Sequence, residues 1–528
     1  MKKNILYIAL LVGQLVLTTG LSLMTVSCSS ELDIEKHGNM GSMDTYYNTD
    51  ENVNTGTASL YLEAKSAYYN WLFVKNLLSD DVWCGGGQRS DNGEMEKLNE
   101  YSFDSNHNMI ESLYKGFYAI IYKACLLTDK TQGDTPVMQR AINEAKVFRA
   151  LSHFELVTLF GTAPVVDHLL TPGEYQQPNS TPAELWAAVE EDLTEAISSG
   201  ALPSKNDVND TETGIRVTKE FAQALLGKAY LFQGKNNEAA KMLDNVINSS
   251  KYALFPGEYD DQFHAAANNN CESLFEFQKR NDPEQVWNTF DMVYIMQGWR
   301  TSSLNYSPTA LMKLAVGNYG FFNPRKSLYD AFVAWEGEDG YRKNKTLWSY
   351  DQLKAFGVEI QPGASVYGNE GSFFWKNQAY REDCSVDMSY FQIGQFIDLK
   401  LMRYAEVLLL AAEAHLQAGN AAKATEYMNM VRTRAQETPL TIVTLNDIKT
   451  EKRLELCNEG VRYQDLVRWG DAKTAMANQG KDVPAYTGTE VQWNWHNTKY
   501  GFQDRNVLLP IPLKELELNP NMEQNPGW

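Results

Sequence analysis

Flat aromatic side chains with a polar edge are the first residues of this sequence that could do chemistry. The chain has 12 Trp and 28 Tyr among 528 residues. Such rings suit a surface that is apolar on one side and wet at the ring edge. Trp83 stands in the Gly-rich segment 80–89 (DDVWCGGGQR), which cannot form a helix at low cost. Trp287 and Trp299 stand in a long stretch with little helical periodicity, so helix packing does not explain these rings.

Motifs of known catalytic sites are missing from the sequence. The seven His are at least 15 residues apart, which excludes HExxH and HxH metal-ligand pairs. No GxSxG elbow, P-loop or dinucleotide-binding fingerprint occurs. Residues 452–462 mix both charge signs at helical spacing, and we interpret them as a partly buried ion-pair network rather than a catalytic group. We therefore assign no catalytic residue, no metal ligand and no cofactor from the sequence; whether a structural metal is bound is not determined by it.

Cys28 is a candidate for covalent lipid attachment. A basic start (MKK) precedes a mostly apolar stretch, and no charged residue occurs over residues 4–30. This pattern is typical of a secretory signal peptide. The small residue before Cys28 resembles a bacterial lipobox, although Thr25 replaces the aliphatic residue of that pattern. We predict a signal peptide over residues 1–27 and acylation at Cys28; the alternatives are an ordinary signal peptide and a retained anchor helix.

Composition limits the class of protein. The chain carries 47 basic and 67 acidic residues, for a formal net charge of −20, so nucleic acid is a poor ligand. Hydrophobic residues make up 43% and charged residues 22%, a globular balance that excludes wholesale disorder and a multi-span membrane protein. The five Cys after residue 28 are odd in number and show no CxxC spacing, which predicts free thiols.

The elements that must position the aromatic residues are mostly helices. Residues 181–184 (TPAE) combine a capping Thr, a Pro for the first turn and a Glu that completes a capping box. Segments 224–246 and 409–431 share small residues and a central Gly at matching positions, which is typical of tetratricopeptide helix pairs. They lie 185 residues apart, which excludes a tandem solenoid. We predict a mainly α fold: a tetratricopeptide-like helical scaffold with long loop-rich insertions and a few short strands.

The stretch of residues 271–398 differs in composition and periodicity from the helical segments. It is rich in Gly, Asn, Tyr, Trp and Phe, and LFEFQ at 274–278 alternates like a short strand. Loop-dominated regions of this length inside a compact protein are usually functional. No clean linker interrupts the chain. We therefore predict one domain over residues 46–528, with a loop-rich insertion at about 271–398, preceded by an acidic tether over residues 28–45.

Four segments in sequence order carry a resemblance to a known family. They contain EAKVFRA with FELVTLFG (144–161), MRYAEVLLL with EA (402–414), EKRLE with EGVR and DLVRWG (451–470), and LLPIP with LNPN and QNPG (508–527). In these motifs the sequence resembles the SusD/RagB family, the outer-membrane nutrient-binding lipoproteins of Bacteroidota. The signal peptide and Cys28 agree with the resemblance.

The resemblance implies a non-catalytic protein that binds glycan at the cell surface. It implies a lipid anchor in the outer membrane, facing the cell surface, and a lid that closes over a SusC-like TonB-dependent transporter. Acidic residues behind Cys28 (SSELDIE) resemble the surface-export signal of Bacteroidota lipoproteins; a solvated tether is the alternative. We expect the protein to capture an oligo- or polysaccharide and deliver it to the transporter.

No family motif identifies the ligand residues, so we select them by the chemistry that sugar binding requires. An aromatic ring stacks on the C–H face of a sugar, while planar polar groups bond its hydroxyls. Trp493 and Trp495 alternate as on one face of a strand and are weaker candidates than the loop residues. The residues selected as ligand-binding are Trp83, Trp287, Trp299, Tyr294, Asn288 and Arg89.

Two other classes of function stay open. A surface glycoside hydrolase would release reducing sugars from a bound polysaccharide, because its two carboxylates need not be neighbours in sequence. A member of the same fold that binds peptides, or a scaffold whose only partner is protein, would bind no carbohydrate. The sequence does not name the sugar or its linkage.

Overall fold

The structure, a computed structural model, describes residues 43–388, 391–495 and 501–528. Contacts divide the chain into two units, Met1–Tyr46 and Tyr47–Trp528. Within the first unit the described part is helix α2 (Met43–Tyr46), which holds the last residues of the predicted tether. The predicted signal peptide and Cys28 lie outside the described residues. All that follows concerns Tyr47–Trp528.

Helices are the main secondary structure of this unit, so the predicted mainly α fold is confirmed. The N-terminal helices are α3 (Asp50–Leu77), α4 (Gly93–Glu100), α5 (Asn108–Lys130), α6 (Pro136–Phe160), α7 (Pro182–Ser198), α8 (Lys219–Phe232) and α9 (Asn236–Asn248). The C-terminal helices are α16 (Tyr404–Gln417), α17 (Ala421–Arg434), α18 (Leu445–Glu455), α19 (Arg462–Arg468), α20 (Ala472–Ala475) and α21 (Leu513–Leu518). Thr181 caps α7 in the predicted capping box with Glu184.

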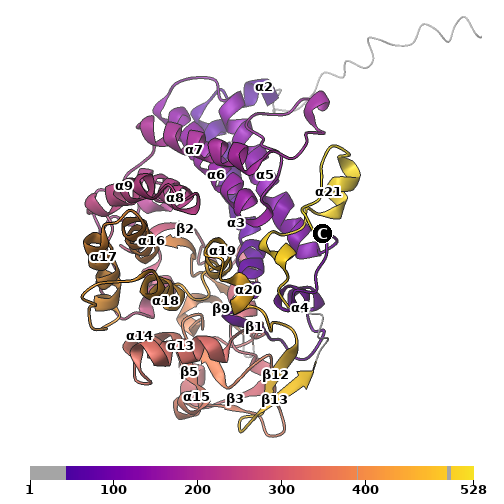
Figure 1. Cartoon of the computed structure of the whole chain (residues 1–528), viewed down its shortest axis with the longest axis vertical. Helices are drawn as coiled ribbons and strands as arrows, with labels where there is room; N and C mark the ends of the chain where they lie inside the picture. The colour runs from indigo at the N-terminus through magenta and orange to yellow at the C-terminus, as the bar shows by residue number, and fades with distance from the viewer. Residues whose placement is uncertain (1–42, 389–390, 496–500) are drawn as a thin grey trace, which may run out of the picture. The chain divides into compact units, whose positions relative to one another are not determined.

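The two predicted tetratricopeptide segments form helix pairs that pack on each other. α8 packs against α9, α16 packs against α17, and α16 also packs against α9. Residues 185 positions apart in sequence are therefore neighbours in space, as Figure 1 shows at the left of the molecule. A Cβ on Gly227 would lie 2.7 Å from Cγ of Leu243, so the small residue is required by the close approach of α8 and α9.

The insertion is more ordered than the sequence indicates. Between β2 and β11 its described residues form six short α-helices, none longer than 11 residues: α10 (Val286–Thr289), α11 (Val293–Gln297), α12 (Pro308–Lys313), α13 (Lys326–Glu336), α14 (Tyr341–Thr346) and α15 (Tyr350–Phe356). Helices this short show little periodicity, which is why the sequence suggested loops. The insertion has a hydrophobic core of its own, which includes Trp299, Trp375 and Phe373.

All strands of the described residues are short and form small antiparallel sheets. β2 (Ser273–Phe277), near the strand predicted at 274–278, pairs with β11 (Leu399–Arg403), and β1 (Val82–Cys84) pairs with β4 (Phe322–Pro324). β12 (Asp482–Tyr486) pairs with both β13 (Val491–Trp495) and β7 (Val366–Tyr367). The remaining pairs are β3 (Leu304–Tyr306) with β6 (Val358–Ile360), β5 (Leu347–Ser349) with β8 (Ser372–Phe374), and β9 (Cys384–Met388) with β10 (Phe391–Gln395).

A buried ion-pair network joins the insertion to the helices, as predicted for residues 452–462. Glu455 lies 3.0 Å from Arg342 on α14 and 3.1 Å from Arg403 on β11, and it also pairs with Arg434 on α17. Burial alone would raise the pKa of Glu455, but these cations hold it well below its ordinary value. The network therefore fixes α14, β11, α17 and α18 against one another.

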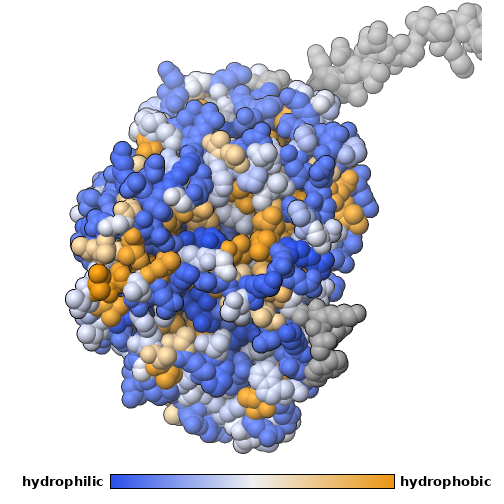
Figure 2. Space-filling view, viewed as in Figure 1, coloured by the Kyte–Doolittle hydropathy of each residue, from blue (hydrophilic) through white to orange (hydrophobic). Residues whose placement is uncertain are grey.

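The surface of the unit is mostly polar. Figure 2 shows hydrophilic residues over most of the visible face, with apolar residues gathered in a few places such as the region of α17. Among the described residues, no helix is both long and apolar enough to cross a membrane. The five described Cys are free thiols, as predicted.

Candidate functional site

Trp83 is held on several sides by neighbouring groups. It pairs with Asn323 in the β1–β4 ribbon, and its side chain is buried, with 5% of the residue exposed. Its indole N–H donates to Glu370 at 2.6 Å, and the guanidinium carbon of Arg325 lies 3.5 Å from its ring centroid. The structure therefore makes Trp83 a fixed wall rather than the open stacking ring expected from its Gly-rich segment.

Trp493 is the exposed ring beside this wall. It lies on β13, 53% exposed, with its ring centroid 6.3 Å from that of Trp83 at an interplanar angle of 66°. Both rings line a cleft of about 540 Å³, which we call the Trp493 cleft. Its lining residues are Asp80, Trp83, Arg325, Ser327, Glu370, Thr474, Ala475, Asn478, Gln479, Lys481, Asp482 and Trp493.

The polar groups of the Trp493 cleft are held in place by hydrogen bonds. Gln479 donates to the carbonyl of Ser79 at 2.7 Å, and Lys481 donates to Asn478 Oδ1 at 3.0 Å. Asp80 accepts two bonds from Arg462, at 2.8 and 3.0 Å. A cleft of this size with one exposed indole and several planar polar side chains has the chemistry of a sugar site.

Charge in the cleft is nearly balanced. Burial alone would raise the pKa of Asp80, but Arg453 and Arg462 hold it well below its usual range. Burial lowers the pKa of the Arg325 guanidinium to about 10, which nearby Glu370 opposes. Both groups are ionised at neutral pH and have opposite charges close by, so the cleft offers hydrogen-bonding groups rather than a strong net field.

Arg89 is committed to carboxylates near this wall. Its guanidinium forms a two-point ion pair with Glu100, with Nη2 at 2.9 Å from Oε2, and lies 3.5 Å from Glu96. It also donates to the hydroxyl of Tyr367 at 3.5 Å. Tyr367 packs with Trp83. Arg89 therefore contacts Tyr367, which packs against Trp83, and Arg89 itself does not line the cleft.

Trp299 packs inside the insertion. Only 3% of the residue is exposed, and its indole N–H donates to the carbonyl of Phe374 at 2.8 Å. Its ring centroid is 6.1 Å from those of Phe373 and Trp375. The insertion uses Trp299 to build its own core, so both ring faces are taken by protein and we do not carry this residue into the proposed site.

The remaining predicted residues lie in one segment apart from the Trp493 cleft. Trp287 on α10 is 66% exposed and meets Phe290 edge-on at a centroid distance of 5.3 Å. Tyr294 on α11 is partly buried, and its hydroxyl donates to the carbonyl of Asp398 at 3.3 Å. The side chain of Asn288 lies outside the described part of the structure. Neither Trp287 nor Tyr294 lines the cleft.

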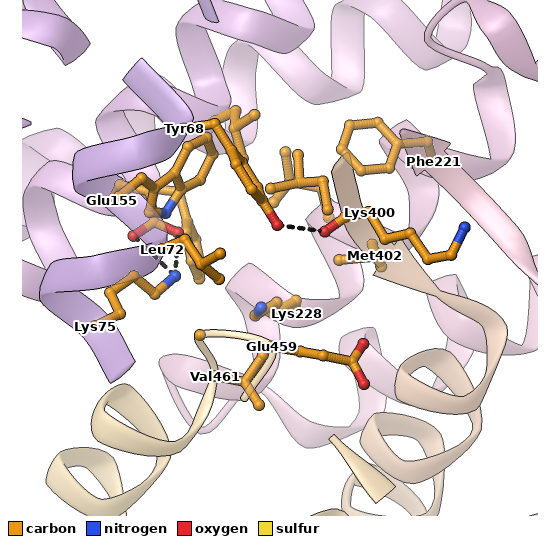
Figure 3. Close-up of a pocket in the computed structure, with 16 residues that line it drawn as sticks. Tyr68, Leu72, Lys75, Glu155, Phe221, Lys228, Lys400, Met402, Glu459 and Val461 are labelled. Atoms are coloured by element: carbon orange, nitrogen blue, oxygen red, sulfur yellow. Dashed lines mark hydrogen bonds and ion pairs between the residues drawn. The ribbon is translucent and has the colours of Figure 1, made fainter. Parts of the chain in front are cut away.

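A second cavity, enclosed by α3, α6, α8 and β11, is too small for a sugar. Its volume is about 30 Å³, which has room for about one water molecule. Figure 3 shows the Lys75–Glu155 ion pair on one side and Tyr68, which donates to the Lys400 carbonyl at 2.8 Å, above it. This cavity is a packing feature of the scaffold. Within the described residues, no group of three His, Cys, Asp or Glu side chains could hold a metal ion.

Comparison with known proteins identifies the family. The model of the SusD family matches residues 283–528. A model described as "Starch-binding associating with outer membrane" matches residues 32–231. The chain belongs to the SusD/RagB family. The two matches fall on both halves of the chain, in agreement with motifs found from 144 to 527.

Curated SusD relatives match over most of the chain. "Starch-binding protein SusD" of Bacteroides thetaiotaomicron is 25% identical over 501 residues, which cover 88% of this chain and 87% of that protein. A "SusD-like protein" of Bacteroides ovatus is 23% identical over 475 residues, covering 86% and 82%.

Solved SusD-like structures share the fold. A "Laminarin binding SusD-like protein" is 27% identical with a TM-score of 0.75, covering 92% of this chain and all of that one. "Surface glycan-binding protein A from Bacteroides thetaiotaomicron in complex with laminarihexaose" is 22% identical with a TM-score of 0.69, covering 90% of this chain and all of that one.

Proposed function

We propose that this SusD-family protein captures glycan at the cell surface through the Trp493 cleft. The observation that carries the proposal is the half-exposed Trp493 ring, set at an angle to Trp83 in a cleft of about 540 Å³ with polar walls. The names of relatives, which state binding of starch, laminarin and laminarihexaose, support a glycan as ligand.

The proposal includes a lipid anchor at Cys28 and a SusC-like TonB-dependent transporter as partner. The family description, which mentions association with the outer membrane, supports this location. Acyl chains on Cys28 would hold the protein at the membrane, since each buried methylene contributes about 0.8 kcal/mol. The protein would act as a lid that delivers its glycan and would catalyse no reaction on it. Co-purification of the tagged protein with a large barrel protein tests the partnership, and a Cys28→Ala protein found only in the soluble fraction would confirm the anchor.

Native affinity electrophoresis of the full chain, purified in detergent, tests glycan binding. Gels would contain laminarin or soluble starch, and a protein without carbohydrate affinity would serve as the mobility standard. We expect retardation in at least one gel and no release of reducing sugar. Sugar release would instead identify a hydrolase, and the absence of retardation would contradict the proposal.

Trp493→Ala is the decisive variant for the cleft. Loss of one stacked ring should weaken retention about tenfold, because ~1.4 kcal/mol corresponds to that factor. Tyr175→Ala is the matched control, since Tyr175 is 63% exposed and does not line the cleft. Trp287→Ala tests the segment favoured by the sequence. Equal retention of Trp493→Ala and wild type would remove the cleft from the proposal.

A further inference from the structure

The insertion contains a cleft that is larger than the Trp493 cleft. Its volume is about 640 Å³, and we call it the Tyr319 cleft. β3 with residues 300–302 just before it, Leu311 of α12 and the segment before β4 form most of its walls. Its lining residues are Arg300, Thr301, Ser302, Leu304, Asn305, Tyr306, Leu311, Val316, Gly317, Asn318, Tyr319 and Gln361.

The walls of the Tyr319 cleft combine aromatic rings with hydroxyl and amide groups. Tyr319 is 37% exposed and Tyr306 is partly buried, and Asn305 and Ser302 are exposed to solvent. These groups can offer a ring to the C–H face of a sugar and bond its hydroxyls. The Trp493 cleft combines the same two kinds of group.

The backbone that carries Tyr319 is fixed before any ligand arrives. Thr301 Oγ1 accepts hydrogen bonds from Gly317 N at 2.8 Å and Asn318 N at 3.0 Å, and Thr301 N donates to the carbonyl of Asn318 at 3.0 Å. Gln361 donates to the carbonyl of Leu304 at 3.2 Å. A wall held in this way does not need to be ordered on binding, which favours affinity.

The charge of the cleft indicates the class of ligand. Arg300 is the one charged side chain among its lining residues. Its Nη1 lies 3.0 Å from Asp91, and its Nε donates to Ser302 at 2.9 Å. Because this cation is already paired, the cleft has no free charge for a carboxylate or sulfate group. Its chemistry fits a neutral sugar.

The two clefts are joined by a short piece of backbone. Tyr319 lines one and Arg325 the other, and six residues of extended chain span at most about 20 Å. The residues directly after β1 run beside this piece, with Gly86 N donating to the carbonyl of Gly320 at 2.9 Å. A Cβ on Gly85 would lie 2.0 Å from that carbonyl oxygen, so the close approach requires glycine.

We propose that the Tyr319 cleft is a second carbohydrate subsite and that one neutral glycan chain occupies both clefts. The inference rests on the proposed glycan-binding function and extends it to a second location and a ligand class. Occupation of one cleft raises the effective concentration of the same chain at the other. Long chains therefore bind more tightly than short ones.

Retention of the full chain in laminarin gels tests the second subsite. Tyr319→Ala should weaken retention about tenfold, and Tyr306→Ala should weaken it as well, whereas Tyr319→Phe should stay close to wild type because it keeps the ring. Trp493→Ala should keep weak retention that the double variant Trp493→Ala/Tyr319→Ala loses. Tyr175→Ala is the matched control, and circular dichroism of each variant verifies folding.

The outcomes separate the two proposals. Wild-type retention by Tyr319→Ala and Tyr306→Ala, with loss in Trp493→Ala, would overturn the second subsite and leave the Trp493 cleft as the binding site. The reverse pattern would overturn the Trp493 cleft and support the Tyr319 cleft as the site. Stronger retention on carboxymethylated laminarin than on laminarin would overturn the neutral class. A wild-type protein that laminarin and starch do not retard would overturn both proposals.

Discussion

At the residue scale, the surroundings of each ring decide what it can do. Trp83 and Trp493 are both tryptophans in segments without helix periodicity, yet the first is 5% and the second 53% exposed. Trp83 has its indole N–H on Glu370 and a guanidinium on its face, so it is a supporting wall. Trp493 keeps the free surface that stacking requires. The alternation of Trp493 and Trp495 was the signal that could have given this strand more weight.

Burial of His153 on α6 makes stability depend on pH. Its side chain is fully buried, and burial lowers its pKa to about 3. In the unfolded chain the pKa is near 6.5, so between these values the unfolded state binds the extra proton. The free energy of unfolding should therefore fall by about 1.4 kcal/mol per pH unit below about pH 6 on account of this residue.

His153→Gln should flatten that pH dependence. Chemical denaturation at pH 7, 6 and 5 measures the free energy of unfolding of both proteins. The control is His168→Gln, because His168 is exposed and its pKa is raised by hydrogen bonds to Asp167 and Glu174. A wild-type slope that persists in His153→Gln would contradict the assignment.

At the element scale, helix pairs require small residues at defined positions. Gly227 of α8 faces Leu243 of α9, and a Cβ there would lie 2.7 Å from Cγ and 3.0 Å from Cδ2 of that leucine. The related pair α16–α17 has Ala412 at the matching position. The spacing of small residues therefore predicts which helices pair, and the size of each residue sets how closely they approach.

Gly227→Ala should destabilise the protein by about 1–3 kcal/mol, the usual cost of overpacking a core. The thermal unfolding midpoint, followed by circular dichroism, measures the effect. Gly173→Ala is a suitable control, since a Cβ there would meet no atom within 4 Å. An unchanged midpoint in Gly227→Ala would show that α9 can shift to accept the methyl group.

At the scale of the whole unit, one carboxylate connects the scaffold to the insertion. Glu455 on α18 is fully buried and pairs with arginines from three other elements, Arg342, Arg403 and Arg434. The Tyr319 cleft is built from the insertion, and the Trp493 cleft combines insertion residues such as Arg325 and Glu370 with segments before and after the insertion. The long helices form the scaffold (Figure 1). The relative placement of the two parts thus depends on buried charge.

Glu455→Gln should be strongly destabilising, by about 3–5 kcal/mol, because it removes a buried carboxylate shared by three buried guanidinium groups and leaves their network one negative charge short. Urea denaturation gives the free energy of unfolding. Glu426→Gln removes the exposed partner of Lys423 and should cost about 0.5 kcal/mol or less. Similar changes in the free energy of unfolding for the two variants would mean that the remaining carboxylates, Glu272 among them, neutralise the charge of the arginines.

The sequence by itself determined the helical scaffold, the capping box at Thr181, the repeated helix pair, the buried ion network and the family. These features depend on local periodicity and on motifs whose residues are close in the chain. The site was decided by tertiary structure. The walls of the Trp493 cleft come from segments between Asp80 and Trp493, and the Tyr319 cleft joins residues 300–319 to Gln361. Trp299 is buried because the insertion builds a core of its own, and Trp493 is half-exposed because little of the chain packs over its face of the small β12–β13 sheet. The alternation of Trp493 and Trp495 indicates a strand, but no local pattern gives the exposure of a ring, since exposure depends on what the rest of the chain packs against it.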